Sequence, residues 1–237
     1  MERTTEAVFF DAGYTLLCMD PDQPVLFRRV CAEAGIELVH ERFTDGVAKA
    51  NALLGPRHPR EVPTAFSQAA VDRFWTEYNR VLLAACARDP RHADKAEEVY
   101  RRFALAISWR VYDEVPAVLR TLRARGLTLG VISNWTGDLE EVLERVELRS
   151  SFDFVLDSAH LGFEKPHAEI FDEALRRASV EPDAALHVGD SPDHDVDGAL
   201  AAGLRAALLD RHDRHQGFNR APVVRTLQDI EDVLALL

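Results

Sequence analysis

The chain has 237 residues, of which 47% are hydrophobic and 29% are charged, so it is long and apolar enough to bury a globular core. Its 40 acidic residues outnumber 28 basic ones and give a net charge of −12, which disfavours binding to nucleic acids and to anionic membrane surfaces. Three cysteines without metal-ligand spacing suit a reducing compartment, and no apolar run approaches the ~20 residues that span a bilayer, so we expect a cytoplasmic protein.

The first predicted element is a short β-strand at residues 7–10, which ends at Asp11. Residues 18–107 carry apolar side chains at helical spacing and are expected to be almost entirely helical. Strands and helices then alternate to the end of the chain. The expected strands are 127–132, 152–156, 184–188, 206–209 and 223–224, and the expected helices are 139–146, 168–178, 198–202 and a last one that follows a capping box at Thr226 and Asp229.

This alternation predicts an α/β fold with a parallel sheet that is covered by helices on both faces. Because the first strand belongs with the later α/β region, we predict a core of residues 1–17 and 108–237 that is interrupted by a helical domain of residues 18–107. In open parallel sheets the ligand site lies beyond the carboxyl ends of the strands. An insertion after the first strand is expected at that edge, where it can act as a lid.

Acidic side chains stand at the expected carboxyl ends of two strands. Asp11 follows the first strand, and Asp190 follows the strand at 184–188, with Asp195 close behind. Two facing carboxylates need a cation or a proton to relieve their repulsion, and a set of oxygen ligands favours Mg²⁺. Capping of the following helix by these aspartates is compatible with metal binding.

Groups that can bind an anion stand at the same expected edge. Ser133, the backbone N–H of Asn134 and Lys165 can donate hydrogen bonds to a tetrahedral oxyanion. Lys165 is one of only three lysines among the 28 basic residues, so its identity is better explained by chemistry than by composition. A carboxylate such as Asp11 beside a bound phosphoryl group can act as a nucleophile and form an aspartyl-phosphate.

These residues, in this order, resemble the four motifs of the haloacid dehalogenase-like superfamily, and the resemblance covers nearly the whole chain. It implies a Rossmann-like core with a helical cap inserted after the first motif. It also implies Asp11 as the nucleophile and a Mg²⁺ ion held by Asp11, the backbone carbonyl of Gly13 and Asp190, with Asp195 supporting the metal site. Ser133 is then expected to bind the phosphoryl group, and Lys165 to orient it.

Gly13 departs from the pattern of the family's phosphatases, which have an aspartate there as the general acid–base. Loss of a general acid typically lowers a rate by ~10²–10⁴-fold. We therefore expect a Mg²⁺-dependent hydrolase of small phosphate-containing molecules that favours good leaving groups, such as acyl or aryl phosphates.

Three alternatives remain open from the sequence. A dehalogenase acting on a halogenated substrate would use the same Asp11, although the Gly189-Asp190-Ser191 motif weakens that interpretation. A phosphonate-cleaving enzyme would need a lysine in the cap, where Lys49 is available. A member without turnover could bind phosphate only. In the cap, Arg57 and Arg60 are either a solvated loop or a means of recruiting an anionic substrate, and neither the substrate nor the oligomeric state follows from the pattern.

Overall fold

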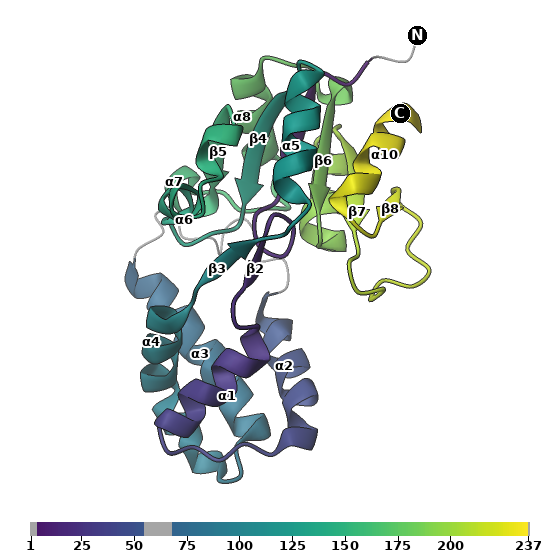
Figure 1. The fold of residues 1–237 in the computed structure, drawn as a ribbon. Coiled ribbons are helices and arrows are strands. Elements are labelled where there is room, and N and C mark those ends of the chain that lie inside the picture. Colours follow the sequence, from purple (N-terminus) through teal and green to yellow (C-terminus); the bar gives the residue numbers. More distant parts are fainter. Residues whose placement is uncertain (1–3, 55–67, 237) are drawn as a thin grey trace. The chain divides into compact units, whose positions relative to one another are not determined.

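The chain divides into two compact units in the computed structural model, which describes residues 4–54 and 68–236 (Figure 1). The core unit comprises Met1–Cys18 and Arg110–Leu237, and the helical unit comprises Met19–Trp109. The boundary falls within a two-stranded sheet that is formed by β2 (Leu17–Met19) and β3 (Trp109–Val111). Two segments that are far apart in the sequence therefore build the core unit.

Within the described residues, a six-stranded parallel sheet forms the centre of the core unit, in the strand order β5-β4-β1-β6-β7-β8. The order places β1 between β4 and β6, so the first strand of the chain lies in the middle of the sheet. The predicted parallel α/β fold is confirmed. The strand bounds are β1 (Ala7–Phe10), β4 (Thr128–Ser133), β5 (Phe154–Asp157), β6 (Ala185–Gly189), β7 (Arg205–Leu209) and β8 (Val223–Val224).

Helices cover the sheet because its strands are apolar on both faces. All four residues of β1 are fully buried, and successive side chains of a strand point to opposite faces. Ala7 and Phe9 belong to a cluster with the apolar side of α8 (Ala168–Ala178), whereas Val8 and Phe10 point to the other face. The ring of Phe10 meets that of Phe152 at 6.4 Å. Burial on both faces explains why these strands read as continuous apolar runs.

The helices of the core unit follow the expected alternation, with two additions, α5 (Val115–Ala124) and α7 (Ser158–Leu161). The helix at Val115–Ala124 was not expected, although Val115, Val118 and Leu122 show its helical period. The capping box at Thr226 and Asp229 is present and precedes the last helix. The bounds are α5 (Val115–Ala124), α6 (Leu139–Arg145), α7 (Ser158–Leu161), α8 (Ala168–Ala178), α9 (Gly198–Ala201) and α10 (Ile230–Leu236), with short 3₁₀ turns at Arg149–Ser151, Pro182–Ala184 and Leu227–Asp229 and a π-helical turn at Pro192–Asp197.

The helical unit packs around its own apolar cluster, which contains Leu26, Phe27, Leu82 and Leu83. The side chains of Cys31 and Cys86 are buried in this cluster as free thiols, and burial raises their pKa values to about 12 and about 11. The helix bounds are α1 (Gln23–Glu33), α2 (Phe43–Asn51), α3 (Gln68–Cys86) and α4 (Ala96–Ala106), with 3₁₀ turns at His40–Arg42, Ala52–Leu54 and Pro90–Lys95.

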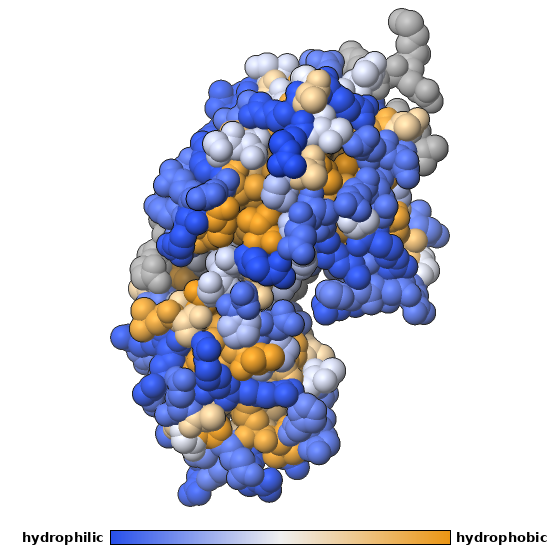
Figure 2. Space-filling view, viewed as in Figure 1, coloured by the Kyte–Doolittle hydropathy of each residue, from blue (hydrophilic) through white to orange (hydrophobic). Residues whose placement is uncertain are grey.

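The visible surface is mainly hydrophilic, and its apolar areas are separated by charged side chains (Figure 2). This distribution agrees with a chain whose apolar residues are used mostly to fill two cores. Among the described residues, none of the helices has the length and apolar character that crossing a bilayer requires.

Candidate active site

The candidate active site lies where three neighbouring strands of the core unit end. Asp11 directly follows β1, Ser133 is the last residue of β4, and Asp190 directly follows β6. Because β4 and β6 flank β1 in parallel, their carboxyl ends meet at one edge of the sheet. The amide of Asp11 donates to the carbonyl of Val188 at 2.9 Å, so the residue is held at the strand end.

Asp11 accepts two hydrogen bonds on the same oxygen. Ser133 Oγ donates to Asp11 Oδ1 at 3.0 Å, and Lys165 Nζ donates to the same atom at 2.7 Å. Within the described residues, Asp11 Oδ2 receives no such bond, so this oxygen is available to another group. Burial raises the pKa of Asp11, the Lys165 ammonium opposes the rise, and the charge of Asp195 adds to it.

Lys165 is almost completely buried between two carboxylates. Its Nζ donates to Asp11 Oδ1 at 2.7 Å and to Asp195 Oδ1 at 2.5 Å. Burial alone would lower the pKa of Lys165, but the charges of the two aspartates outweigh burial and raise it. The side chain therefore stays an ammonium and fixes the distance between the first and last acidic residues of the site.

The side chain of Asn134 holds the backbone of Lys165 in place. Asn134 Oδ1 accepts from the Lys165 amide at 2.7 Å, and Asn134 Nδ2 donates to the Lys165 carbonyl at 2.9 Å. From the sequence only the backbone N–H of Asn134 was considered, as an anion donor. A reciprocal pair of hydrogen bonds between two loops depends on tertiary structure, and no sequence signal indicates it.

The three aspartates expected at a metal site are close together. One carboxylate oxygen from each of Asp11, Asp190 and Asp195 lies within 4.8 Å of the others. Burial, followed by the charges of Asp11 and Asp195, raises the pKa of Asp190 well above its usual value. When all three carboxylates are ionised, the one ammonium leaves two negative charges without a partner, and a divalent cation would neutralise this excess.

Asp195 differs from the other two aspartates because protein groups occupy both of its oxygens. Oδ1 lies 2.5 Å from Lys165 Nζ and 2.9 Å from His187 Nε2, and Oδ2 accepts from the Ser191 amide at 2.9 Å. Burial favours the neutral acid, but Lys165 and His187 outweigh it and lower the pKa of Asp195. This set of partners makes Asp195 an anchor for the lysine.

Two glycines of the site have opposite packing. A Cβ at Gly189 would lie 2.1 Å from Asp195 Cγ, so only glycine allows the aspartate to approach the strand end. A Cβ at Gly13 would touch only Trp135 Cζ3, at an ordinary 3.5 Å. The fold therefore does not require a glycine at position 13, and a side chain can be accommodated there.

His187 is a further member of the buried network around Asp195. It is fully buried in β6, and its ring packs edge-on against Phe171 with centroids 5.3 Å apart. Burial is the main cause that lowers the pKa of His187, so the neutral imidazole donates from Nε2 to Asp195 Oδ1 at 2.9 Å. The signal in the sequence is its position three residues before Asp190 on a strand that ends at the site.

The other residues singled out from the sequence belong to the helical unit. Lys49 is an exposed residue of α2 in the helical unit and forms an ion pair with Asp45 at 2.7 Å. Arg57 and Arg60 lie outside the described residues.

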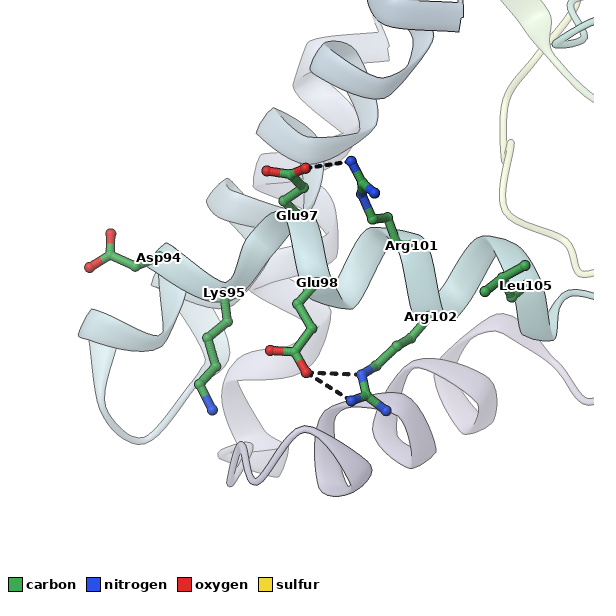
Figure 3. A pocket seen from close by; sticks show the side chains of 7 residues that line it. All are labelled: Asp94, Lys95, Glu97, Glu98, Arg101, Arg102 and Leu105. Atoms are coloured by element: carbon green, nitrogen blue, oxygen red, sulfur yellow. Dashed lines mark hydrogen bonds and ion pairs between the residues drawn. The ribbon is translucent and has the colours of Figure 1, made fainter.

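A hollow beside α4 of the helical unit is a different kind of surface, because four of its charged side chains form ion pairs along α4 (Figure 3). Arg101 bonds to Glu97 at 2.7 Å, and Arg102 pairs with Glu98 at 2.9 Å. We therefore place the candidate site in the core unit.

Comparison with known proteins agrees with this architecture. A family model described as haloacid dehalogenase-like hydrolase matches residues 5–203. The chain belongs to this family. The resemblance inferred from the motifs is confirmed.

Individual relatives differ in how much of the chain they match. The chain is 46% identical over 114 residues to haloacid dehalogenase-like hydrolase domain-containing protein 3 of Bos taurus, a match that covers 48% of this chain and 45% of that protein. It thus spans about half the length of that relative. Pyrimidine 5′-nucleotidase YjjG of Escherichia coli is 39% identical over 234 residues, with 96% of each chain covered. The solved structure of the putative HAD-hydrolase YfnB from Bacillus subtilis shares the fold, with a TM-score of 0.76, 19% identity and coverage of 98% of this chain and 99% of that one.

Proposed function

We propose that this hydrolase removes phosphate from small molecules through a covalent aspartyl-phosphate at Asp11. The observation that carries the proposal is the pair of donors on Asp11 Oδ1, from Ser133 at 3.0 Å and Lys165 at 2.7 Å, beside the cluster of carboxylates. The relative named as a pyrimidine 5′-nucleotidase supports a phosphorylated substrate.

The donor set fits Mg²⁺, because it consists of carboxylate oxygens with an excess negative charge. We propose that Asp11, Asp190 and the backbone carbonyl of Gly13 hold the ion, and that Asp195 supports the site by anchoring Lys165. When bound, Mg²⁺ supplies positive charge that neutralises phosphate oxygens and keeps the two aspartates ionised.

The residues of the chain then divide the work in two steps. The Asp11 carboxylate attacks phosphorus, the bond from phosphorus to the leaving oxygen breaks, and the aspartyl-phosphate forms. Water then attacks that phosphorus, inorganic phosphate leaves, and the Asp11 carboxylate is restored. Ser133 and Lys165 donate hydrogen bonds to the phosphoryl oxygens, and the network of Asp195 and His187 keeps the Lys165 ammonium in position.

Gly13 offers no proton to the leaving group, so the proton comes from water. We therefore propose that the enzyme favours leaving groups that need little protonation, such as aryl or acyl phosphates. In a substrate panel at saturating Mg²⁺, we expect kcat/KM for para-nitrophenyl phosphate to exceed that for an alkyl phosphate by ~10²-fold or more. Equal rates would contradict the preference, and turnover of a halogenated acid without metal would favour a dehalogenase.

The helical unit is proposed to act as the cap that selects the substrate. It is inserted directly after the loop that carries Asp11, which is why its side chains are candidates for specificity. The proposal predicts that substitutions on the helical unit change KM between substrates and leave the phosphoryl chemistry intact.

The decisive test uses a phosphate mimic and one substitution. Beryllofluoride with Mg²⁺ should raise the melting temperature of the wild-type chain, and Asp11→Asn should abolish both this shift and turnover, with a loss of roughly 10⁴-fold or more. Asp45→Asn, at an exposed ion pair on α2, serves as the matched control and should behave as wild type. A full shift in Asp11→Asn would overturn Asp11 as the nucleophile. Binding of the mimic without turnover of any substrate would indicate a phosphate-binding member of the family.

A further inference from the structure

The loop after Asp11 contains a residue in an unfavourable backbone conformation. Tyr14 has φ of 60°, in the left-handed region that side-chain-bearing residues seldom adopt. The loop is tightly wound, because Leu16 and Leu17 both donate their amides to the Ala12 carbonyl at 2.9 Å, and Tyr14 donates to the Leu17 carbonyl at 2.6 Å. A strained residue persists only where its surroundings hold it.

Arg211, which is far from this loop in the sequence, holds the loop in its conformation. It lies two residues beyond the end of β7 and reaches the carbonyls of the loop after β1. Arg211 Nη2 donates to the Thr15 carbonyl at 2.8 Å, and Nε makes a longer contact of 3.4 Å with the Tyr14 carbonyl. The planar guanidinium thus spans two consecutive peptide groups, and one of them belongs to the strained residue.

The guanidinium is itself fixed by a third segment of the core unit. Glu114, the residue before α5, forms an ion pair with Arg211 Nη1 at 2.5 Å, and both side chains are less than 15% exposed. The guanidinium carbon lies 3.7 Å from the centroid of the Tyr112 ring. The Tyr112 amide also donates to the Leu16 carbonyl at 3.2 Å, so residues 112–114 meet the same loop. Arg211 is therefore a half-buried, stacked and ion-paired arginine.

We infer that Arg211 is a positioning residue that keeps the loop after the nucleophile in the conformation needed to bind Mg²⁺. The inference rests on the proposed function, in which the Gly13 carbonyl is a ligand. That carbonyl and the Tyr14 amide belong to one peptide group. A return of Tyr14 to negative φ would therefore rotate the peptide and turn the Gly13 oxygen away from its present direction. The guanidinium prevents this rotation by holding the next two carbonyls.

The experiment measures Mg²⁺ binding to the full-length chain by isothermal titration calorimetry, which needs no turnover. Arg211→Met should weaken binding about tenfold, as is typical for a residue that orients a metal ligand. Tyr14→Gly removes the strain and should bind as wild type. Adding Tyr14→Gly to Arg211→Met should restore the Mg²⁺ affinity to within about threefold of wild type, since glycine adopts positive φ without the hydrogen bonds from Arg211.

Arg149→Met is the matched control. Arg149 also pairs with a glutamate, Glu140 at 2.5 Å, and donates to a backbone carbonyl, that of Phe152 at 3.0 Å. It precedes β5 and so lies at the opposite edge of the sheet from the site. Its loss should leave the Mg²⁺ affinity unchanged. A hydrogen-exchange measurement on residues 12–17 should show faster exchange in Arg211→Met and protection restored in the double variant.

The outcomes separate the two proposals. Absence of Mg²⁺ binding by the wild type would overturn the proposed metal site and this inference with it. If the wild type binds Mg²⁺ and Arg211→Met binds it equally well, only the role of Arg211 is overturned. The same conclusion follows if Tyr14→Gly fails to restore the affinity that Arg211→Met loses, or if Arg149→Met loses as much affinity as Arg211→Met. Should Arg211→Met not fold, Glu114→Gln takes its place, because it weakens the ion pair that fixes the guanidinium. About a threefold loss of affinity, rescued by Tyr14→Gly, is then the expected result, and an unchanged affinity overturns the inference.

Discussion

The two units of the chain bury very different side chains. In the core unit, buried polar and charged residues gather at the carboxyl ends of the strands, among them Asp11, Ser133, Lys165 and Asp195. In the described part of the helical unit, Asn79 is the only buried polar residue, and the rest of the interior consists of aliphatic and aromatic side chains and the thiols of Cys31 and Cys86.

The buried side chains of the core unit are therefore explained by chemistry, and those of the helical unit by packing. Buried charges stabilise a fold poorly, because removing two ions from water costs about as much as their attraction returns. A unit that nevertheless buries one lysine between two aspartates does so for a reason other than stability. The helical unit shows what the same chain builds when only packing and solubility constrain its interior.

The largest expected effect concerns Lys165. Lys165→Met leaves Asp11 and Asp195 facing each other without their common partner, and we expect a loss of about 3–5 kcal/mol in unfolding free energy as well as loss of turnover. Denaturant unfolding without metal measures the loss. Lys95→Met is the control in the helical unit, where Nζ donates to the Ala34 carbonyl at 2.8 Å, and should cost about 1 kcal/mol. Equal losses for the two lysines would remove the contrast between the units.

A cavity made in the helical unit should lower the stability of the protein without changing its Mg²⁺ affinity. Leu83 is fully buried in the interior of that unit, and Leu83→Ala should destabilise the protein by about 3 kcal/mol. Mg²⁺ affinity, measured by calorimetry on the folded variant, should remain within about twofold of wild type because Leu83 belongs to the apolar cluster of the helical unit and the carboxylates belong to the core unit. Leu105→Ala provides the control, since this side chain is 90% exposed. A large change in Mg²⁺ affinity would show that packing and metal binding are coupled.

Gly13→Asp tests whether a general acid is the only group that the site lacks for the hydrolysis of alkyl phosphates. A Cβ at position 13 would lie at an ordinary 3.5 Å from Trp135 Cζ3, so the loop has room for a side chain to begin there. We expect hydrolysis of alkyl phosphates to rise about tenfold, below the ~10²–10⁴-fold of an optimised general acid, while para-nitrophenyl phosphate changes little. Gly13→Asn has the same shape without the proton and should give no increase. An unchanged alkyl rate in Gly13→Asp would mean that another group already serves as the acid.

The smallest expected effect concerns His160 of α7, which forms a hydrogen bond with Asp157 at the end of β5. The hydrogen bond to Asp157, at 2.8 Å from Nδ1, raises the pKa of His160. The raised pKa means that the stabilisation is fully present below the usual value near 6.5 and is lost as pH rises through the higher folded pKa. His160→Gln should therefore cost more at pH 5.5 than at pH 8.5, and less than about 1 kcal/mol because the side chain is 74% exposed.

Denaturant unfolding at the two pH values checks this difference, with the same substitution at the exposed His212 as the control. Turnover should be unaffected by His160→Gln. A change in kcat would place Asp157 in the catalytic network instead of the structural one.

Local patterns were sufficient for most of the fold. The continuous apolar runs of the sheet and the helical period of 168–178 follow from the side chains of a few successive residues, and β1 and α8 have the predicted bounds. The helix at Val115–Ala124 was missed even though its apolar period is present. The pairing of β2 with β3 was missed because a three-residue strand carries almost no periodic signal.

The sequence by itself determined which chemical groups stand at the strand ends, because a parallel sheet brings those ends to one edge whatever the details of packing. Only the tertiary structure decided how those groups are held. Three sets of hydrogen bonds join different elements of the core unit: those of Asn134 with the backbone of Lys165, that of His187 with Asp195, and those of Arg211 with the loop of Tyr14. Such contacts depend on distances of a few tenths of an ångström between different elements, and no pattern along one segment contains them.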